Sequence, residues 1–310
     1  MPMTDLLDIQ QDMIRYGTTV YFGLGLIGNI CNCVMFTRQS YRGSPSSIYF
    51  LYLSLFAIIY LFWSVIPLFY SLNYGDSQTK SVVYCKLRLY GIHNFGQYLR
   101  YAVVFACADR FFASHRDARL RQLSSVGIAL KVLFLMTIVW PIVGIHLPIL
   151  TDLREGICGI TGLYRLIYAI YQTMFVGILP PTLMITFSAL TIHRLHQRHE
   201  TQTRAKQRDR HLMRMVIAEV VVNVITSIPF SLNLVYGGIT YHVVDKSARR
   251  LEIETFLSFF THFLIYFISV APFYLVLLTS KPFRNQFIKL VIRYWNKSMF
   301  RQCQIDSPHI

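Results

Sequence analysis

Seven stretches of this chain are long and apolar enough to cross a lipid bilayer. A bilayer core is about 30 Å thick, so a helix rising 1.5 Å per residue needs about 20 mostly apolar residues to cross it. Such stretches lie at 16–37, 47–72, 86–112, 125–150, 164–192, 212–236 and 253–279. The third is the weakest, because it contains His93, Asn94, Gln97 and Arg100. The pattern predicts an all-α membrane protein folded as a seven-transmembrane helix bundle.

The composition agrees with a membrane protein. Only 15% of the 310 residues are charged, against about 25% in a soluble protein, whereas 54% are hydrophobic. A formal net charge of +15 would suggest nucleic-acid binding in a soluble chain. In a membrane chain the same charge indicates contact with lipid headgroups, so we expect membrane lipids and no nucleic acid as partners.

The basic residues are divided unequally between the two sides of the bundle. The loops after stretches one, three and five and the C-terminal tail hold nineteen Lys and Arg and five acidic residues, a net +14. The other side holds nine of each, and the membrane interior has a net +1. Positive loops stay in the cytosol. We therefore expect a plasma-membrane protein with an extracellular N-terminus at 1–15, a membrane domain at 16–280 and a cytoplasmic tail at 281–310.

The start of that tail has the pattern of an amphipathic helix. Apolar side chains recur at helical spacing over 281–295, which predicts a short juxtamembrane helix on the inner leaflet: Phe283, Phe287, Leu290, Val291 and Tyr294. Cys303 is a candidate for palmitoylation. The glycosylation sequon at 296–298 falls on the cytosolic side and is expected to stay unused.

Cys85 and Arg110 bracket the third stretch. Their separation of 25 residues corresponds to about 37 Å of helix, which places the cysteine at the outer surface and the arginine at the inner one. Cys158 lies in the extracellular loop before the fifth stretch. Because both cysteines face an oxidising compartment, we predict a Cys85–Cys158 disulfide. The remaining cysteines lie within the membrane or in the cytosol: Cys31, Cys33, Cys107 and Cys303.

Short motifs add to this spacing. They are Gly28-Asn29, Leu53-Ser54-Leu55, Asp109-Arg110-Phe111, Trp140, Pro180-Pro181, Pro229, Pro272 and the closing run at 280–284. In this order they resemble the rhodopsin-like (class A) G-protein-coupled receptors. Within that family, residues 85–88 and 272–275 are most similar to invertebrate FMRFamide-type neuropeptide receptors.

The resemblance implies which residues control activation. Arg110 is expected to pair with Asp109 in the inactive state and to contact a heterotrimeric G protein in the active state, with Phe111, Pro229 and Pro272 as further activation residues. Asp209 is a second candidate partner for Arg110. The basic stretch at 193–214 would attract anionic lipid and form part of the G-protein docking surface.

Four positions depart from the family pattern. The usual aspartate of the second stretch aligns with Ile59, so we expect no sodium site there. In the sixth and seventh stretches, family residues are replaced by Asn223, Ser227 and Ala271. Either the activation machinery is altered or coupling is weak. Arg100 lies near mid-membrane, where a structural and a switching role are both open, with Asn223 or polar groups of the fifth stretch as candidate partners.

The ligand class follows partly by exclusion. Amine receptors carry an aspartate at the position of Ile92, and opsins carry a lysine in the region of Ile265 and Tyr266. The polar and aromatic residues toward the outside suit an extracellular peptide ligand, although helix packing is the alternative role for each: His93, Gln97, Glu155, Tyr168, Gln172, Asn233, Tyr236, Glu254 and His262.

Other function classes find less support. The chain has no phosphate-binding loop, nucleophile elbow or paired catalytic carboxylates, so we expect no enzyme activity and no cofactor. His193, His196 and His199 lie among arginines without a carboxylate or thiolate, which makes a metal site a poor interpretation. A transporter or channel is an alternative, but repeated halves are lacking. A decayed or ligand-independent receptor is a third.

Overall fold

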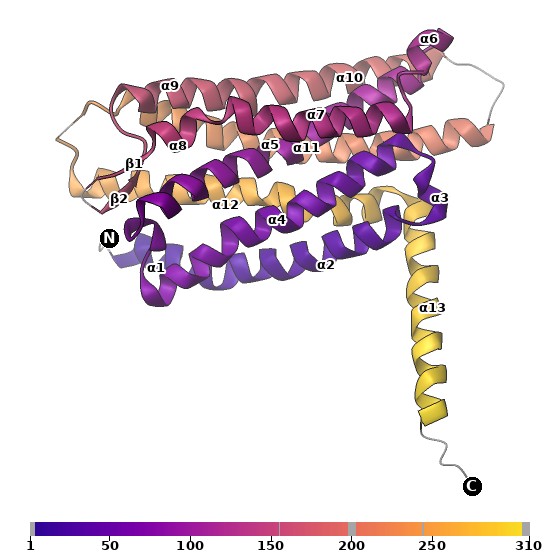
Figure 1. The fold of residues 1–310 in the computed structure, drawn as a ribbon, viewed down its shortest axis with the longest axis horizontal. Coiled ribbons are helices and arrows are strands. Elements are labelled where there is room, and N and C mark those ends of the chain that lie inside the picture. The colour runs from indigo at the N-terminus through magenta and orange to yellow at the C-terminus, as the bar shows by residue number, and fades with distance from the viewer. Residues whose placement is uncertain (1–3, 155, 198–202, 244, 306–310) are drawn as a thin grey trace.

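The protein is an antiparallel bundle of seven long helical segments (Figure 1). The computed structural model describes residues 4–154, 156–197, 203–243 and 245–305. The first segment comprises α1, Thr4–Asp12, the π-turn η1, Met13–Gly17, and α2, Thr18–Phe36. The next three are α4, Pro45–Tyr74, then α5, Val82–Ala113, then α7, Val126–Val143, with α8, His146–Leu150. The fifth segment comprises α9, Leu163–Gln172, the π-turn η3, Thr173–Ile178, and α10, Leu179–Gln197. The last two are α11, Thr203–Ile239, and α12, Ala248–Thr279. The predicted all-α seven-helix membrane bundle is confirmed.

Short elements connect these segments. At one end lie α3, Gln39–Arg42, and α6, Ala118–Arg121; at the other lie the 3-10 turn η2, Ser77–Thr79, and a hairpin of strands β1, Asp152–Arg154, and β2, Ile157–Gly159. The two strands pair antiparallel, with Leu153 opposite Cys158. Serine side chains cap three of the long helices by accepting a backbone N–H at the N-terminus: Ser81 for α5, Ser125 for α7 and Ser247 for α12.

Helix α5 occupies the middle of the bundle, and this position explains why its hydropathy is low. Six of the seven segments are apolar enough to cross a membrane by composition alone, and α5 is the exception. It packs against α4, α7, α10 and α11, and 18 of its 32 residues are buried. Its polar side chains therefore face other helices instead of lipid, which is where a membrane tolerates them.

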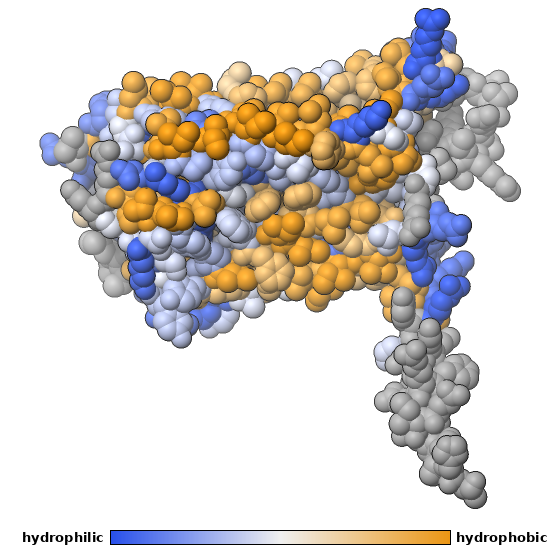
Figure 2. Space-filling model, viewed as in Figure 1, coloured by the Kyte–Doolittle hydropathy of each residue, from blue (hydrophilic) through white to orange (hydrophobic). Residues whose placement is uncertain are grey.

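The outer surface of the bundle carries the apolar side chains that lipid would cover. Figure 2 shows them as orange patches along the helices, with blue concentrated toward the two ends. Phe134 is 70% exposed and Leu278 73% exposed, although both side chains are apolar. An apolar belt of this extent is typical of a surface made for the bilayer.

Helices α2 and α12 approach each other closely at Gly28. A Cβ atom on Gly28 would lie 3.0 Å from Cβ of Phe273, so a glycine fits this contact without a shift. The amide of the next residue, Asn29, donates to the backbone oxygens of Gly25 and Ser269, each at 2.7 Å. The motif Gly28-Asn29 therefore joins the first and last segments of the bundle.

The juxtamembrane helix is longer than predicted. Helix α13 spans Lys281–Ile305 and runs across the bundle axis, away from the other helices (Figure 1). Phe283 and Leu290 are buried, and Phe283 packs against Phe36 at 5.7 Å between ring centroids. The predicted end at 295 is wrong because no proline or glycine interrupts the chain from 283 to 305, so the backbone continues as helix. The side chains of Tyr294 and Cys303, and those of the sequon at 296–298, lie outside the described residues.

Candidate functional site

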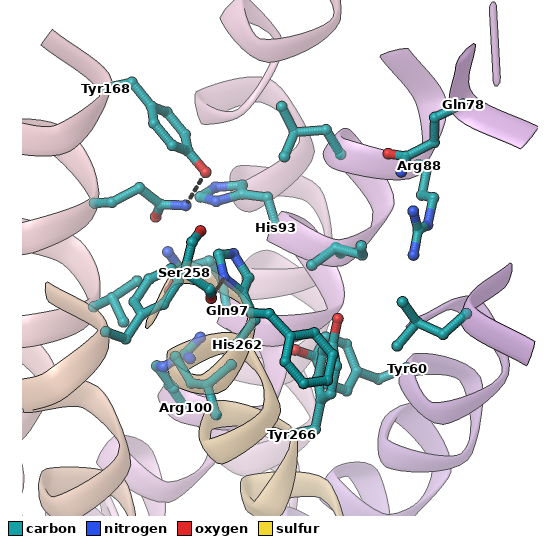
Figure 3. A pocket seen from close by; sticks show the side chains of 18 residues that line it. Tyr60, Gln78, Arg88, His93, Gln97, Arg100, Tyr168, Ser258, His262 and Tyr266 are labelled. Carbon is teal, nitrogen blue, oxygen red and sulfur yellow. Dashed lines mark hydrogen bonds between the residues drawn. The ribbon is translucent and has the colours of Figure 1, made fainter. Parts of the chain in front are cut away.

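A cavity of about 270 Å³ lies toward the end of the bundle that carries the β-hairpin. Figure 3 shows the side chains that line it. Helices α4, α5, α9, α11 and α12 surround it. Figure 3 shows Arg100 below Gln97 and His262, and Arg88 beside Gln78 on the far side of the cavity. A hydrogen bond of 2.6 Å from the Gln172 amide to the Tyr168 hydroxyl fixes its α9 wall.

A second cavity of about 420 Å³ adjoins the first one. The two share four lining residues, Leu89, Tyr168, Ser258 and His262, so they form one cleft with an inner and an outer part. The outer part is bounded by the hairpin through Cys158 and Gly159. The predicted Cys85–Cys158 disulfide is present in the structure, with 5.8 Å between the Cα atoms, and ties this hairpin to the first turn of α5.

The structure brings most of the sequence-predicted ligand residues to this cleft. The inner part is lined by His93, Gln97, Tyr168, Gln172 and His262. The outer part is lined by Tyr168, Asn233, Tyr236, Glu254 and His262. Glu155 lies outside the described residues. These side chains come from four segments that are distant in sequence, which a cleft inside a helix bundle requires.

Sequence reasoning missed several lining residues. Tyr60 of α4, Arg88 of α5 and Tyr266 of α12 line the inner part, and Arg165 of α9 lines the outer part. The signal for Arg88 was available, since it lies three residues after Cys85 on the helix that faces the cleft. Nothing in the sequence indicated that the Tyr60 ring would turn inward.

The carboxylate of the cleft is already engaged. Glu254 accepts hydrogen bonds from Lys246 at 2.6 Å, from Arg250 at 2.9 Å and from the Tyr236 hydroxyl at 2.9 Å. The Arg250 guanidinium also donates to Tyr236 at 3.0 Å. This cluster links α11 and α12 at the mouth of the cleft and leaves Glu254 with two cationic neighbours.

At the opposite end of the bundle, Asp109 and Arg110 form a buried ion pair. The guanidinium donates to one carboxylate oxygen through Nη2 at 2.6 Å and Nε at 3.2 Å. Asp109 also accepts from the hydroxyls of Ser46 at 3.0 Å and Ser124 at 2.6 Å. The side chains are 4% and 6% exposed, so the pair is shielded from water.

The other predicted activation residues are placed as follows. The Phe111 ring packs against Phe187, and the Arg194 guanidinium carbon lies 4.5 Å above it. Pro229 and Pro272 lie inside α11 and α12. The Asp209 backbone is part of α11, but its side chain lies outside the described residues, so its pairing with Arg110 stays a prediction.

The departures from the family pattern also have positions in the bundle. Ile59 is 42% exposed and faces outward, whereas its neighbour Tyr60 is 2% exposed and faces the core. At this level of α4 the inward residue is therefore Tyr60. Asn223, Ser227 and Ala271 are all buried. The Asn223 amide nitrogen donates to the backbone oxygen of Glu219 at 2.9 Å, whereas its side-chain oxygen is buried without a hydrogen-bond partner, so the structure shows no bond from Arg100 to Asn223.

Sequence comparison agrees with this geometry. The family described as 7 transmembrane receptor (rhodopsin family) matches residues 28–273, from α2 to α12. A search of curated proteins found no match. The family match covers well over half of the chain and at least part of every segment of the bundle. The chain therefore belongs to the rhodopsin family of seven-transmembrane receptors.

Proposed function

We propose that this receptor binds a neuropeptide, as FMRFamide-type receptors do, and activates a heterotrimeric G protein from the plasma membrane. The observation that carries the proposal is the two-part cleft, lined by aromatic, amide and charged side chains beneath a hairpin held by the Cys85–Cys158 disulfide. A cleft with this mixed lining suits a ligand that has both apolar and polar groups.

The mechanism couples the cleft to the Asp109–Arg110 pair through α5. Gln97, on the wall of the cleft, and Arg110 lie on this one helix, about 20 Å apart along its axis. A ligand that prefers a different arrangement of α5 and α11 shifts the bundle toward it, in proportion to its differential affinity. Opening the ion pair frees the Arg110 guanidinium for a G protein at the cytosolic face, where the basic stretch at 193–214 adds to the docking surface.

Expression with a promiscuous G protein and a library of amidated peptides tests this function. We expect at least one peptide to give a concentration-dependent signal, and Arg110→Ala to abolish it while surface expression stays within about twofold of wild type. Silence across the library together with a measurable solute flux would instead establish the transporter alternative. A signal of equal size without any peptide would indicate a ligand-independent receptor.

A further inference from the structure

Arg100 lies at the floor of the cleft as a buried cation with no counter-ion in the described chain. The residue is 5% exposed, and its Nε atom is buried without a hydrogen-bond partner. It lines the inner cavity, and no ion pair among the described residues includes it. An unpaired charge inside a membrane protein is costly unless a partner binds to it. Such a residue therefore marks a functional site.

Gln97, beside Arg100, also lacks hydrogen-bond partners. Gln97 lies one turn above it on α5, is fully buried, and neither its amide nitrogen nor its carbonyl oxygen has a partner in the structure. His262 and the Tyr266 ring complete this corner of the cavity (Figure 3). A guanidinium and a side-chain amide that point into one cavity are donors suited to a planar anion.

The rest of the cleft lining is also positively charged. Arg88 lines the inner part near its mouth, with its Nε atom also lacking a partner, and Arg165 lines the outer part. Glu254 is the one carboxylate among the described lining residues, and Lys246 and Arg250 already pair with it. The lining therefore offers cations without matching acids, which selects ligands of the opposite charge.

We propose that Arg100 and Gln97 form a subsite for the carboxylate of the ligand. The subsite rests on the proposed function only in placing the ligand in this cleft. Arg88 and Arg100 are 12 residues apart, about 18 Å along α5, and Figure 3 shows them on different sides of the cavity, so we assign them to different groups of the ligand. The carboxylate goes to Arg100 at the floor, and Arg88 meets a second polar group nearer the mouth. On an amidated peptide the carboxylate is an Asp or Glu side chain.

A melting experiment on the purified receptor tests the subsite without an agonist. Sodium methanesulfonate, chloride, acetate and benzoate are compared at equal ionic strength. We expect acetate and benzoate to raise the melting temperature above that in methanesulfonate and chloride, and Arg100→Gln to lose this rise. Arg249→Gln is the matched control, because Arg249 pairs with Glu252 at 2.9 Å outside the cleft.

The variants also distinguish loss of the subsite from loss of the fold. Arg100→Gln removes an unpaired buried charge, so in methanesulfonate it should melt no lower than wild type. Arg100→Lys keeps the charge and should keep part of the carboxylate effect. An equal rise in wild type and Arg100→Gln, no rise at all, or a rise with chloride alone would overturn the carboxylate subsite.

Ligand pairs then distinguish a peptide from a small organic acid. Each active peptide is compared with its Asp→Asn or Glu→Gln counterpart and with its free-acid form, and a set of small carboxylic acids is tested in parallel. We expect loss of the ligand carboxylate, or Arg100→Gln, to lower potency at least about 30-fold, since one partner of a buried charge pair is left alone. Peptides that signal equally with and without a carboxylate would refute the subsite and leave the peptide-receptor function intact.

Discussion

At the scale of single residues, Asp109 connects several elements at the end of the bundle that bears α3 and α6. Its two carboxylate oxygens accept from Ser46 of α4, from Ser124 of the following loop and from Arg110 of its own helix. Three elements therefore hold the carboxylate in place, and it in turn holds the guanidinium. We therefore expect the pair to open as a unit, as the proposed switch requires.

Replacement of Asp109 by Asn tests this switch. Asn keeps hydrogen-bonding capacity toward the serines but removes the negative charge, so the closed state loses the Asp109–Arg110 ion pair. We expect Asp109→Asn to raise ligand-independent signalling at least about threefold at equal surface expression, where 1.4 kcal/mol corresponds to tenfold in population. Asp245→Asn, at an exposed acid on the hairpin end of the bundle, should leave signalling unchanged. Unaltered basal signalling in Asp109→Asn would contradict the switch.

Residue-scale prediction from sequence succeeded where spacing was informative and failed where side-chain direction mattered. The Cys85–Arg110 separation located both ends of α5, and the disulfide followed from it. The alignment puts Ile59 at the position of the family's aspartate, but Ile59 faces outward and its neighbour Tyr60 faces the core. One residue shifts a helical position by about 100°, so a small error in alignment changes which side chain faces the core.

At the scale of elements, the α2–α12 contact depends on the absence of a side chain at Gly28. A methyl group there would meet Cβ of Phe273 at 3.0 Å and the Tyr274 ring at 3.3 Å, and a Cβ atom cannot rotate away. We expect Gly28→Ala to destabilise the receptor by about 1–3 kcal/mol, measured as a lower melting temperature in detergent. Gly23→Ala on the same helix meets nothing within 4 Å and should be neutral or stabilising. Equal melting of the two variants would show that α2 and α12 separate easily.

The disulfide makes the hairpin part of the wall of the cleft. Because Cys85 and Cys158 form one bond, Cys85→Ser and Cys158→Ser should reduce surface expression equally, and the double variant should add nothing. Flow cytometry of an N-terminal epitope gives the measurement. Cys31→Ser is the control, since Cys31 is a free cysteine in α2. Additive losses in the double variant would mean that the two cysteines act separately.

The positions of the transmembrane helices could be predicted from the sequence, but their π-turns and the end of α13 could not. Six of the seven segments fall where apolar length alone predicts them, because the bilayer sets a minimum of about 20 residues, and α5 falls short of that level. The π-turns at Met13–Gly17 and Thr173–Ile178 have no counterpart among the sequence predictions. The extension of α13 beyond 295 was missed because the apolar face ends before the helix does.

At the scale of the whole molecule, the two ends of the bundle carry different charges, +14 and 0 by the sequence count. This difference predicts that the end bearing α3, α6 and α13 faces the cytosol. An N-terminal epitope should be accessible on intact cells and a C-terminal epitope only after permeabilisation. Asn296 should remain unglycosylated, with no change in gel mobility after glycosidase treatment. Staining of the C-terminal epitope on intact cells would reverse the assigned orientation.

The enclosed, polar character of α5 has a consequence for how the chain is made. A helix enters the lipid from the translocon according to its own hydropathy, and α5 alone falls short of the level that the other six segments reach. Its stable neighbours include α7 and α10, which are synthesised later. Integration of α5 should therefore be delayed until these partners emerge, and a chain that stops soon after Ala113 should leave the segment poorly inserted. The receptor's central helix would thus be among the last to settle during biogenesis.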